Sequence, residues 1–96
     1  MTELTDIIQS PIFAKQKKKL HKKQIRDLDE AVKSIVENHE IGDAKMGDLQ
    51  GVRVLKFRSQ NQQVLLAYEV IESTLYLYYF GVHENFYRNL KRYLKE

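Results

Sequence analysis

The sequence contains no cysteine, which excludes disulfide scaffolds, thiolate metal sites and cysteine nucleophiles. With four glycines and one proline, it has neither a glycine-rich phosphate loop nor a G-x-S-x-G nucleophile elbow. The longest nearly unbroken apolar run, Leu75 to Val82, is less than half the length of a membrane-spanning helix. The first residues are acidic and lack a long apolar stretch, so we expect no signal peptide, no membrane partner and a cytoplasmic location.

The length and composition indicate one folded domain, residues 1–96. Hydrophobic residues make up 43% of the chain and charged residues 30%, a balance that is unlike that of disordered proteins. A chain of this length buries roughly two-thirds of its unfolded surface, which is enough for one core. Little room remains for a second domain that binds a cofactor, and we expect no cofactor.

The formal net charge of +3 hides a local concentration of positive charge. Residues 15–26 include seven basic residues and no acidic one, whereas the rest of the chain has nine basic and thirteen acidic residues. This basic stretch is either a solvated helix face or a surface that contacts phosphates. It lacks interleaved aromatic residues, so we do not expect bases to stack along it.

Hydrophobic periodicity predicts an α+β fold with the element order β-α-α-β-β-β-α. Ser10-Pro11 is a typical helix start, because serine caps free amides and proline suits the first helical position. The helical hairpin should pack on one face of a mostly antiparallel four-stranded sheet. The expected elements are a strand at about 4–9, helices at about 11–21 and 24–39, strands at about 52–57, 64–71 and 74–80, and a helix at about 84–95.

Two cations share one face of the strand predicted at 52–57. Lys56 and Arg58 are two residues apart, so their side chains point the same way, and Arg53 points to the other face. Cations on a strand are usually solvated or prevent edge pairing. Two on one face of a sheet whose other face carries the helices could instead line an anion site.

His83 and Tyr87 form a second candidate pair. If the last helix begins by residue 83 or 84, these side chains lie on adjacent turns of one face. A histidine and a tyrosine beside cations can transfer protons in RNA phosphodiester cleavage while the cations stabilise the phosphorane. The alternative is that Tyr87 belongs to the core and His83 caps the helix. No His, Asp and Glu set has metal-ligand spacing, so we expect no metal.

Three stretches of the sequence resemble the RelE/ParE superfamily of toxins from type II toxin–antitoxin systems. Ile8–Phe13 resembles the family's first strand and the helix after it, and Gly47–Phe57 resembles the approach to its second strand. Phe80–Arg88 resembles its closing motif, a glycine and a histidine followed by an aromatic residue four positions later. Together they span nearly the whole chain.

The resemblance implies roles for these residues. RelE-like and YafQ-like members cut mRNA in the ribosomal A site without a metal, and ParE-like members inhibit DNA gyrase. In the first group, His83 and Tyr87 match the closing catalytic pair, and Lys56 and Arg58 match cations that contact the scissile phosphate. A cognate antitoxin would cover the sheet face and the basic surface. Candidate contacts to RNA and the ribosome are Lys15, Lys18, Lys19, Lys22, Lys23, Arg53 and Arg88.

One position departs from the family pattern. Many mRNA-cutting members have an arginine early in the third strand, where this chain has Gln62-Gln63. Either Arg58 takes over its role, or the activity is weaker or different. The leading hypothesis is a ribosome-dependent mRNA endoribonuclease, and the alternative is a gyrase inhibitor. A helical hairpin that reads DNA is disfavoured, because its cations are nearly all lysine rather than a mixture suited to base edges.

Overall fold

The computed structural model describes residues 3–82 and 84–95. It confirms the predicted α+β fold, but the sheet has five strands rather than four. The extra strand follows the second helix and is only two residues long, too short to leave a hydrophobic pattern in the sequence. The elements are β1 (Asp6–Gln9), α1 (Pro11–Lys18), α2 (Lys22–Glu37), β2 (Asp43–Ala44), the 3-10 turn η1 (Gly47–Leu49), β3 (Arg53–Ser59), β4 (Gln62–Ile71), β5 (Thr74–Val82) and α3 (Phe86–Lys95).

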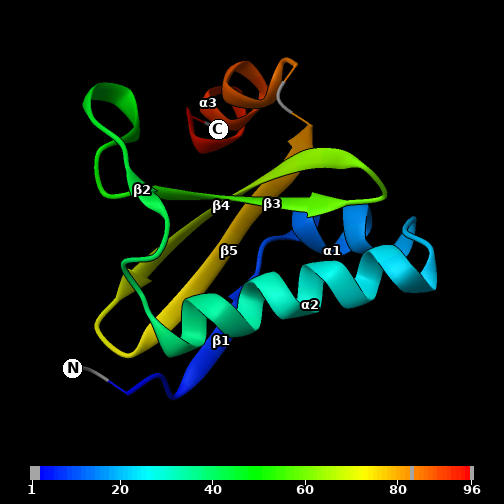
Figure 1. The fold of residues 1–96 in the computed structure, drawn as a ribbon. Helices are drawn as coiled ribbons and strands as arrows, with labels where there is room; N and C mark the ends of the chain where they lie inside the picture. The colour runs from blue at the N-terminus through cyan, green and yellow to red at the C-terminus, as the bar shows by residue number, and fades with distance from the viewer. Residues whose placement is uncertain (1–2, 83, 96) are drawn as a thin grey trace.

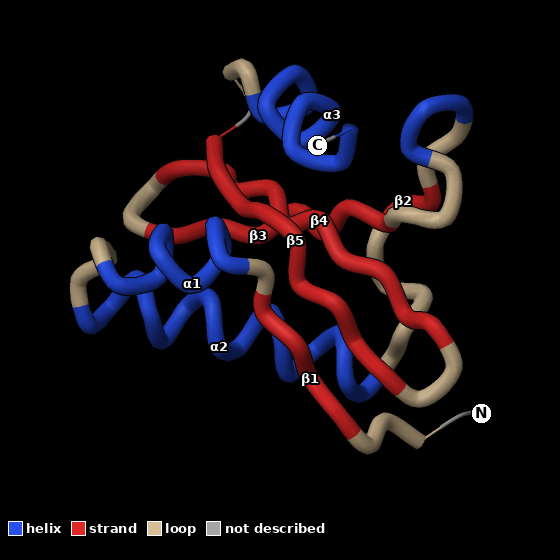
Figure 2. The backbone as a smooth tube through the Cα atoms, turned by 180° about the vertical axis from the view of Figure 1, so that it is seen from behind, coloured by secondary structure: helices blue, strands red, loops and turns tan. Residues whose placement is uncertain are grey.

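The strands are ordered β1-β5-β4-β3-β2 across the sheet. β1 is parallel to β5, and the other neighbours are antiparallel. Helices α1 and α2 cover one face of the sheet and α3 covers part of the other (Figures 1 and 2). No helix within the described residues is long and apolar enough to cross a membrane.

The larger part of the core lies between the helical hairpin and the sheet. Phe13 of α1 and Ile35 of α2 are buried against Leu66 and Leu77. As predicted, α1 begins at Pro11: the Ser10 hydroxyl accepts a hydrogen bond from the Phe13 amide at 3.0 Å. An ion pair of 3.1 Å between Lys17 and Asp29 joins the two helices at the surface.

The smaller part of the core anchors α3 on the opposite face. Phe86 and Leu90 of α3 are buried with Val54, Leu65 and Ala67 of the sheet. The helix therefore lies across the central strands, with its first turn close to the end of β5 (Figure 1).

Tyr68 of β4 fixes the connection that follows α2. Its hydroxyl accepts a hydrogen bond from the Gly42 amide at 2.9 Å and donates one to the His39 carbonyl at 2.8 Å. A Cβ atom at position 42 would lie 2.8 Å from the Tyr68 ring, so glycine is required there. Burial is the main reason that the pKa of Tyr68 is raised, which keeps its hydroxyl protonated as a donor.

Candidate functional site

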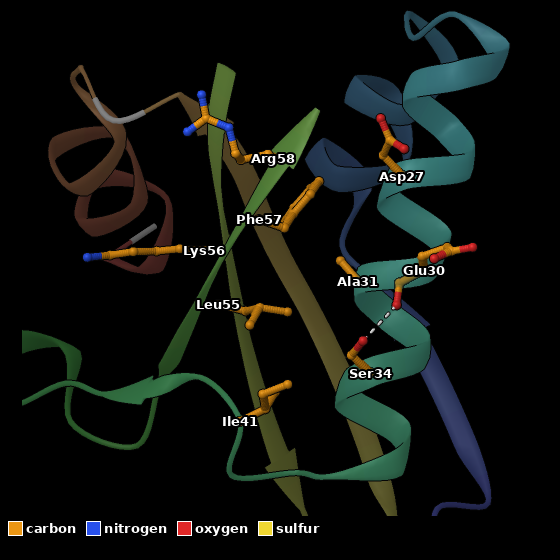
Figure 3. Close-up of a pocket in the computed structure, with 9 residues that line it drawn as sticks. All are labelled: Asp27, Glu30, Ala31, Ser34, Ile41, Leu55, Lys56, Phe57 and Arg58. Atoms are coloured by element: carbon orange, nitrogen blue, oxygen red, sulfur yellow. Dashed lines mark hydrogen bonds between the residues drawn. The ribbon is translucent and has the colours of Figure 1, made fainter. Parts of the chain in front are cut away.

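Lys56 and Arg58 lie on the face of β3 that faces α3. Their neighbours Leu55 and Phe57 pack against the core under the helical hairpin, whereas Val54 belongs to the core under α3. Figure 3 shows Lys56 and Arg58 pointing away from α2. Both side chains are exposed, and neither forms an ion pair within residues 3–82 and 84–95. The predicted alternation is confirmed, and two unpaired cations stand together on one strand face.

The turn between β3 and β4 sets which residue lies beside Arg58. Gln60 and Asn61 have φ angles of 54° and 66°, as in the two-residue turns that match the twist of antiparallel strands. The resulting register pairs Arg58 with Gln63. Residues directly opposite each other in a sheet share a face and lie about 5 Å apart at their Cβ atoms. The arginine therefore lies next to the position where the sequence departs from the mRNA-cutting relatives.

Tyr87 is the second residue of α3, since the helix begins at Phe86 and not at residue 83 or 84. Its ring meets the ring of Phe86 edge to face, with centroids 5.1 Å apart. The Nζ atom of Lys45 lies 5.3 Å from the centre of the Tyr87 ring, within the range of a cation–π interaction. Tyr87 is half-buried against the core on the α3 face of the sheet, and Lys56 lies on the same face, opposite Leu65 of that core.

Lys45 adds a third cation to this region, and sequence reasoning missed it. It is an isolated lysine after a two-residue strand, and no motif or spacing marks it. Its place beside Tyr87 depends on the folded connection between α2 and β3. We call Lys45, Lys56, Arg58 and Tyr87 the β3–α3 site. His83 lies outside the described residues, so its proposed role stays a prediction.

The basic stretch forms an exposed surface where α1 ends and α2 begins, which we call the basic junction. Lys22 and Lys23 begin α2, whose first turn has no acidic residue, so their charges add to the positive end of the helix dipole. Leu20 and Gln24 line a small pocket with Ser59 and Gln62, which places the junction beside the β3–β4 turn. The exposed lysines are Lys15, Lys18, Lys19, Lys22 and Lys23.

The two remaining predicted contacts differ in their surroundings. Arg53 is half-buried and donates hydrogen bonds to the carbonyls of Glu40 and Gly42, at 3.2 and 2.7 Å. Its guanidinium thus stabilises the connection after α2, on the other side of β3 from Lys56. Arg88 is exposed on α3 and donates to the side chain of Asn85. Of the two, only Arg88 is placed to meet a large anionic partner directly.

A groove runs between α2 and the outer edge of β3. β2 pairs only with Arg53 and Val54, so among the described strands none covers the edge from Leu55 to Ser59. The groove has a volume of about 320 Å³, and Figure 3 shows apolar side chains on its floor and carboxylates on its α2 side. It is lined by Asp27, Glu30, Ala31, Ser34, Ile41, Leu55, Lys56, Phe57 and Arg58. The sequence could not indicate this groove, because the groove forms only where the short strand β2 ends and leaves the edge of β3 uncovered.

Within the described residues, no three side chains of His, Asp or Glu gather as a potential metal site. This observation concerns only the arrangement of the side chains. That the protein acts without a metal stays a prediction.

Comparisons with known proteins identify the family. The family model of the ParE-like toxins of type II bacterial toxin–antitoxin systems matches residues 7–91. A search of curated proteins found no significant match.

Two solved structures from E. coli share the fold. A mutant of the toxin RelE in the free state aligns with a TM-score of 0.71 at 17% sequence identity, covering 96% of this chain and 93% of that one. The intact RelBE toxin–antitoxin complex aligns with a TM-score of 0.65 at 19% identity, covering 79% and 93%. Because the family model covers most of its length, the chain belongs to the ParE-like toxins of type II bacterial toxin–antitoxin systems.

Proposed function

We propose that this toxin cleaves mRNA on the ribosome by attack of the RNA's own 2′-hydroxyl, without a metal. The observation that carries the proposal is the β3–α3 site, where Lys56 and Arg58 are exposed and unpaired among the described residues, on the side where Tyr87 lies. Exposed cations beside a phenol suit a reaction whose transition state gathers negative charge on phosphate oxygens.

In the proposed reaction, the 2′-oxygen forms a bond to phosphorus and the bond from phosphorus to the 5′-oxygen breaks. One group takes the proton of the 2′-hydroxyl, and another gives a proton to the departing 5′-oxygen. We assign these proton transfers to His83 and Tyr87. Lys56 and Arg58 would hold the scissile phosphate and stabilise the additional charge of the phosphorane. The products are a 2′,3′-cyclic phosphate and a 5′-hydroxyl.

The register of the β3–β4 turn supports the assignment of Arg58. Because Arg58 lies directly opposite Gln63, its guanidinium is within reach of the space that an arginine early in β4 would occupy. We propose that Arg58 replaces the arginine that many mRNA-cutting relatives have there.

The basic junction would dock the protein on ribosomal RNA. Leu20 and Gln24 of the junction lie beside Ser59 and Gln62, which flank the β3–β4 turn just after Arg58, so docked RNA would approach the end of β3 that carries Arg58. Such contacts to phosphates weaken steeply with salt.

The proposal is tested with the purified chain in a reconstituted translation system. We expect primer extension to show discrete, codon-linked cuts in translated mRNA and none in the same mRNA without ribosomes. Tyr87→Phe, which removes the hydroxyl and keeps the ring, should suppress the cuts. Lys33→Ala, on the outer face of α2, should not. Intact mRNA at concentrations of the toxin that stop protein synthesis in this system would reject the nuclease assignment.

Inhibition of DNA gyrase is a second candidate, and it is favoured by the family model, which is named for ParE, and by Gln62-Gln63 in β4. A supercoiling assay with purified gyrase separates the two. The gyrase candidate requires loss of supercoiling with mRNA intact, and the nuclease candidate requires the reverse.

We also propose that the antitoxin of this system adds an extended segment to the open edge of β3. Edge strands offer unpaired amides and carbonyls to a further strand. Leu55 and Phe57 would receive apolar side chains in the groove, and Asp27 and Glu30 on α2 would pair with basic ones. The two carboxylates on the α2 wall of the groove thus favour an antitoxin segment whose basic residues face α2 and whose apolar residues face the sheet.

Glu30→Lys should weaken antitoxin binding about tenfold or more, because it puts a like charge against the segment's basic residues. Glu72→Lys makes the same charge change in the exposed turn between β4 and β5, and it should leave the affinity within about twofold. Titration calorimetry with the cognate antitoxin measures both. Equal affinities for the two variants would place the antitoxin elsewhere.

A further inference from the structure

A second concentration of aromatic side chains lies on the α3 face of the sheet, away from the β3–α3 site. Tyr76 and Tyr78 of β5 stack with ring centroids 6.4 Å apart and an interplanar angle of 17°. Tyr79 follows on the same strand, and it lines a pocket together with Tyr93 of α3. Four of the six tyrosines therefore gather where β5 meets the far side of α3.

This surface contains a pocket of about 280 Å³ between the start of α1 and α3, which we call the tyrosine pocket. It is lined by Ile12, Tyr79, Asn89, Arg92 and Tyr93. Asn89 donates a hydrogen bond from its side-chain amide to the Tyr79 hydroxyl at 3.2 Å, which holds the amide within the pocket. The volume is at the lower limit for ligand sites, and it suits one nucleotide rather than a longer segment.

Asn89 of the tyrosine pocket and Tyr87 are on opposite sides of α3, and Arg92 lines both this pocket and a second one beside Tyr87. Successive residues of an α-helix turn by about 100°, so Asn89 and Tyr93 share one face and Tyr87 lies nearly opposite Asn89. The pocket is therefore separate from the β3–α3 site and takes no part in the chemistry proposed there.

Positive charge borders the pocket on two sides. Arg92 is exposed on its α3 wall. On the α1 wall, Lys15 is exposed and lies one turn beyond Ile12, which places the two side chains on neighbouring positions of one helix face. Lys15 also belongs to the basic junction, so the pocket adjoins a surface that carries five of the chain's sixteen lysine and arginine residues.

We propose that the tyrosine pocket binds one unstacked base of single-stranded RNA. The rings of Tyr79 and Tyr93 would stack on the base, the Asn89 amide would hydrogen-bond its edge, and Arg92 and Lys15 would contact the flanking phosphates. Single-stranded RNA is recognised in general by aromatic rings, amides and cations in this combination. The basic junction has no aromatic residue of its own, and the fold supplies them from β5 and α3.

The choice of RNA over a protein partner rests on the proposed function and on the two flanking cations. The tyrosine pocket would hold part of the substrate RNA outside the β3–α3 site. RNA binding by the pocket is measured without ribosomes and without cleavage. The test can therefore support the pocket even if the nuclease assignment fails, and it can reject the pocket even if the nuclease assignment is correct.

The test uses the purified full chain and a short single-stranded RNA with one 2-aminopurine, a base whose fluorescence is quenched by stacking. We expect binding to quench the probe. Tyr93→Ala should raise the Kd about 5- to 100-fold and abolish the quenching, because one stacking contact is lost. Tyr93→Phe, which keeps the ring, should bind within about twofold of the unmodified chain.

Arg92→Ala provides a second measurement that does not depend on packing, since its side chain is exposed. It should reduce the slope of log K against log salt by about 0.7, the value for one phosphate contact on a single strand. Lys33→Ala, on the outer face of α2, should leave both Kd and slope unchanged. The proposal is overturned if the probe is still quenched by the Tyr93→Ala variant. It is also overturned if Tyr93→Ala weakens antitoxin binding but leaves RNA binding the same.

Discussion

Replacing Lys56 and Arg58 together with alanine is expected to lower the rate of mRNA cleavage by at least about 10²–10³-fold, the effect of losing one or more groups that stabilise transition-state charge. Both side chains are exposed and lie outside the two hydrophobic cores. The Tm of the double variant should therefore stay within about 4–8 °C of the unmodified chain, since two surface substitutions change stability by only about 0.5 kcal/mol each. Single-turnover cleavage on stalled ribosomes measures the rate separately from product release.

A charge swap across the β3–β4 ladder provides the control. Arg58→Ala alone should be slow, and Arg58→Ala combined with Gln63→Arg should recover part of the rate, because positions 58 and 63 are directly opposed. Lys33→Ala makes a matched loss of one positive charge on the outer face of α2 and should have no effect on the rate. Cleavage at the normal rate by the double alanine variant would show that these cations do not contact the scissile phosphate.

Replacing Leu90 with alanine is expected to give the largest loss of stability on the α3 face. Leu90 is fully buried, at 0% exposure, and it packs with Phe86 against Val54 and Leu65. Truncation of such a leucine costs about 2–5 kcal/mol, which lowers the Tm of a domain this size by roughly 10–30 °C. Because Leu90 is one turn from Tyr87, the same change loosens the turn that carries the phenol.

Leu94→Ala is the matched control, since it removes the same atoms from a half-buried position of the same helix. It should cost about 1 kcal/mol. Thermal and urea denaturation of the two variants measure the difference. Equal melting temperatures of the two variants would show that the buried Leu90 stabilises the fold no more than the partly exposed Leu94 does.

The sequence predicted the elements whose residues interact locally. Ser10 and Pro11 start α1 because a serine cap and a proline need only the next turn of helix. Lys56 and Arg58 share a face because alternation is a property of a single strand. The apolar residues at 64–71 predicted a strand there, and they form most of β4, which lies between β3 and β5.

The rest depends on contacts between distant segments. Lys45 meets Tyr87, and Ile12 meets Tyr93, only once three layers are assembled. The last helix begins at Phe86 rather than at residue 84, because Asn85 adopts a φ of 64°, a conformation outside the right-handed helix. The sequence predicts Arg53 as a cation that contacts RNA. In the structure its guanidinium instead donates hydrogen bonds to two backbone carbonyls of the connection after α2.

The alternation of side chains along β3 has a consequence for how inhibition and activity are coupled. One short strand directs Leu55 and Phe57 towards the helical hairpin, and Lys56 and Arg58 away from α2 towards the proposed substrate side, while all four residues border the groove at its edge. An antitoxin segment added at this edge would lie beside both sets. If it weakens RNA binding, RNA must weaken antitoxin binding by the same factor, as thermodynamic linkage requires. The two sets nevertheless occupy different positions of β3. Residues 55 and 57 could change to suit a new antitoxin while residues 56 and 58 keep their proposed catalytic role. A one-residue insertion in β3 would exchange the two faces and remove both functions at once.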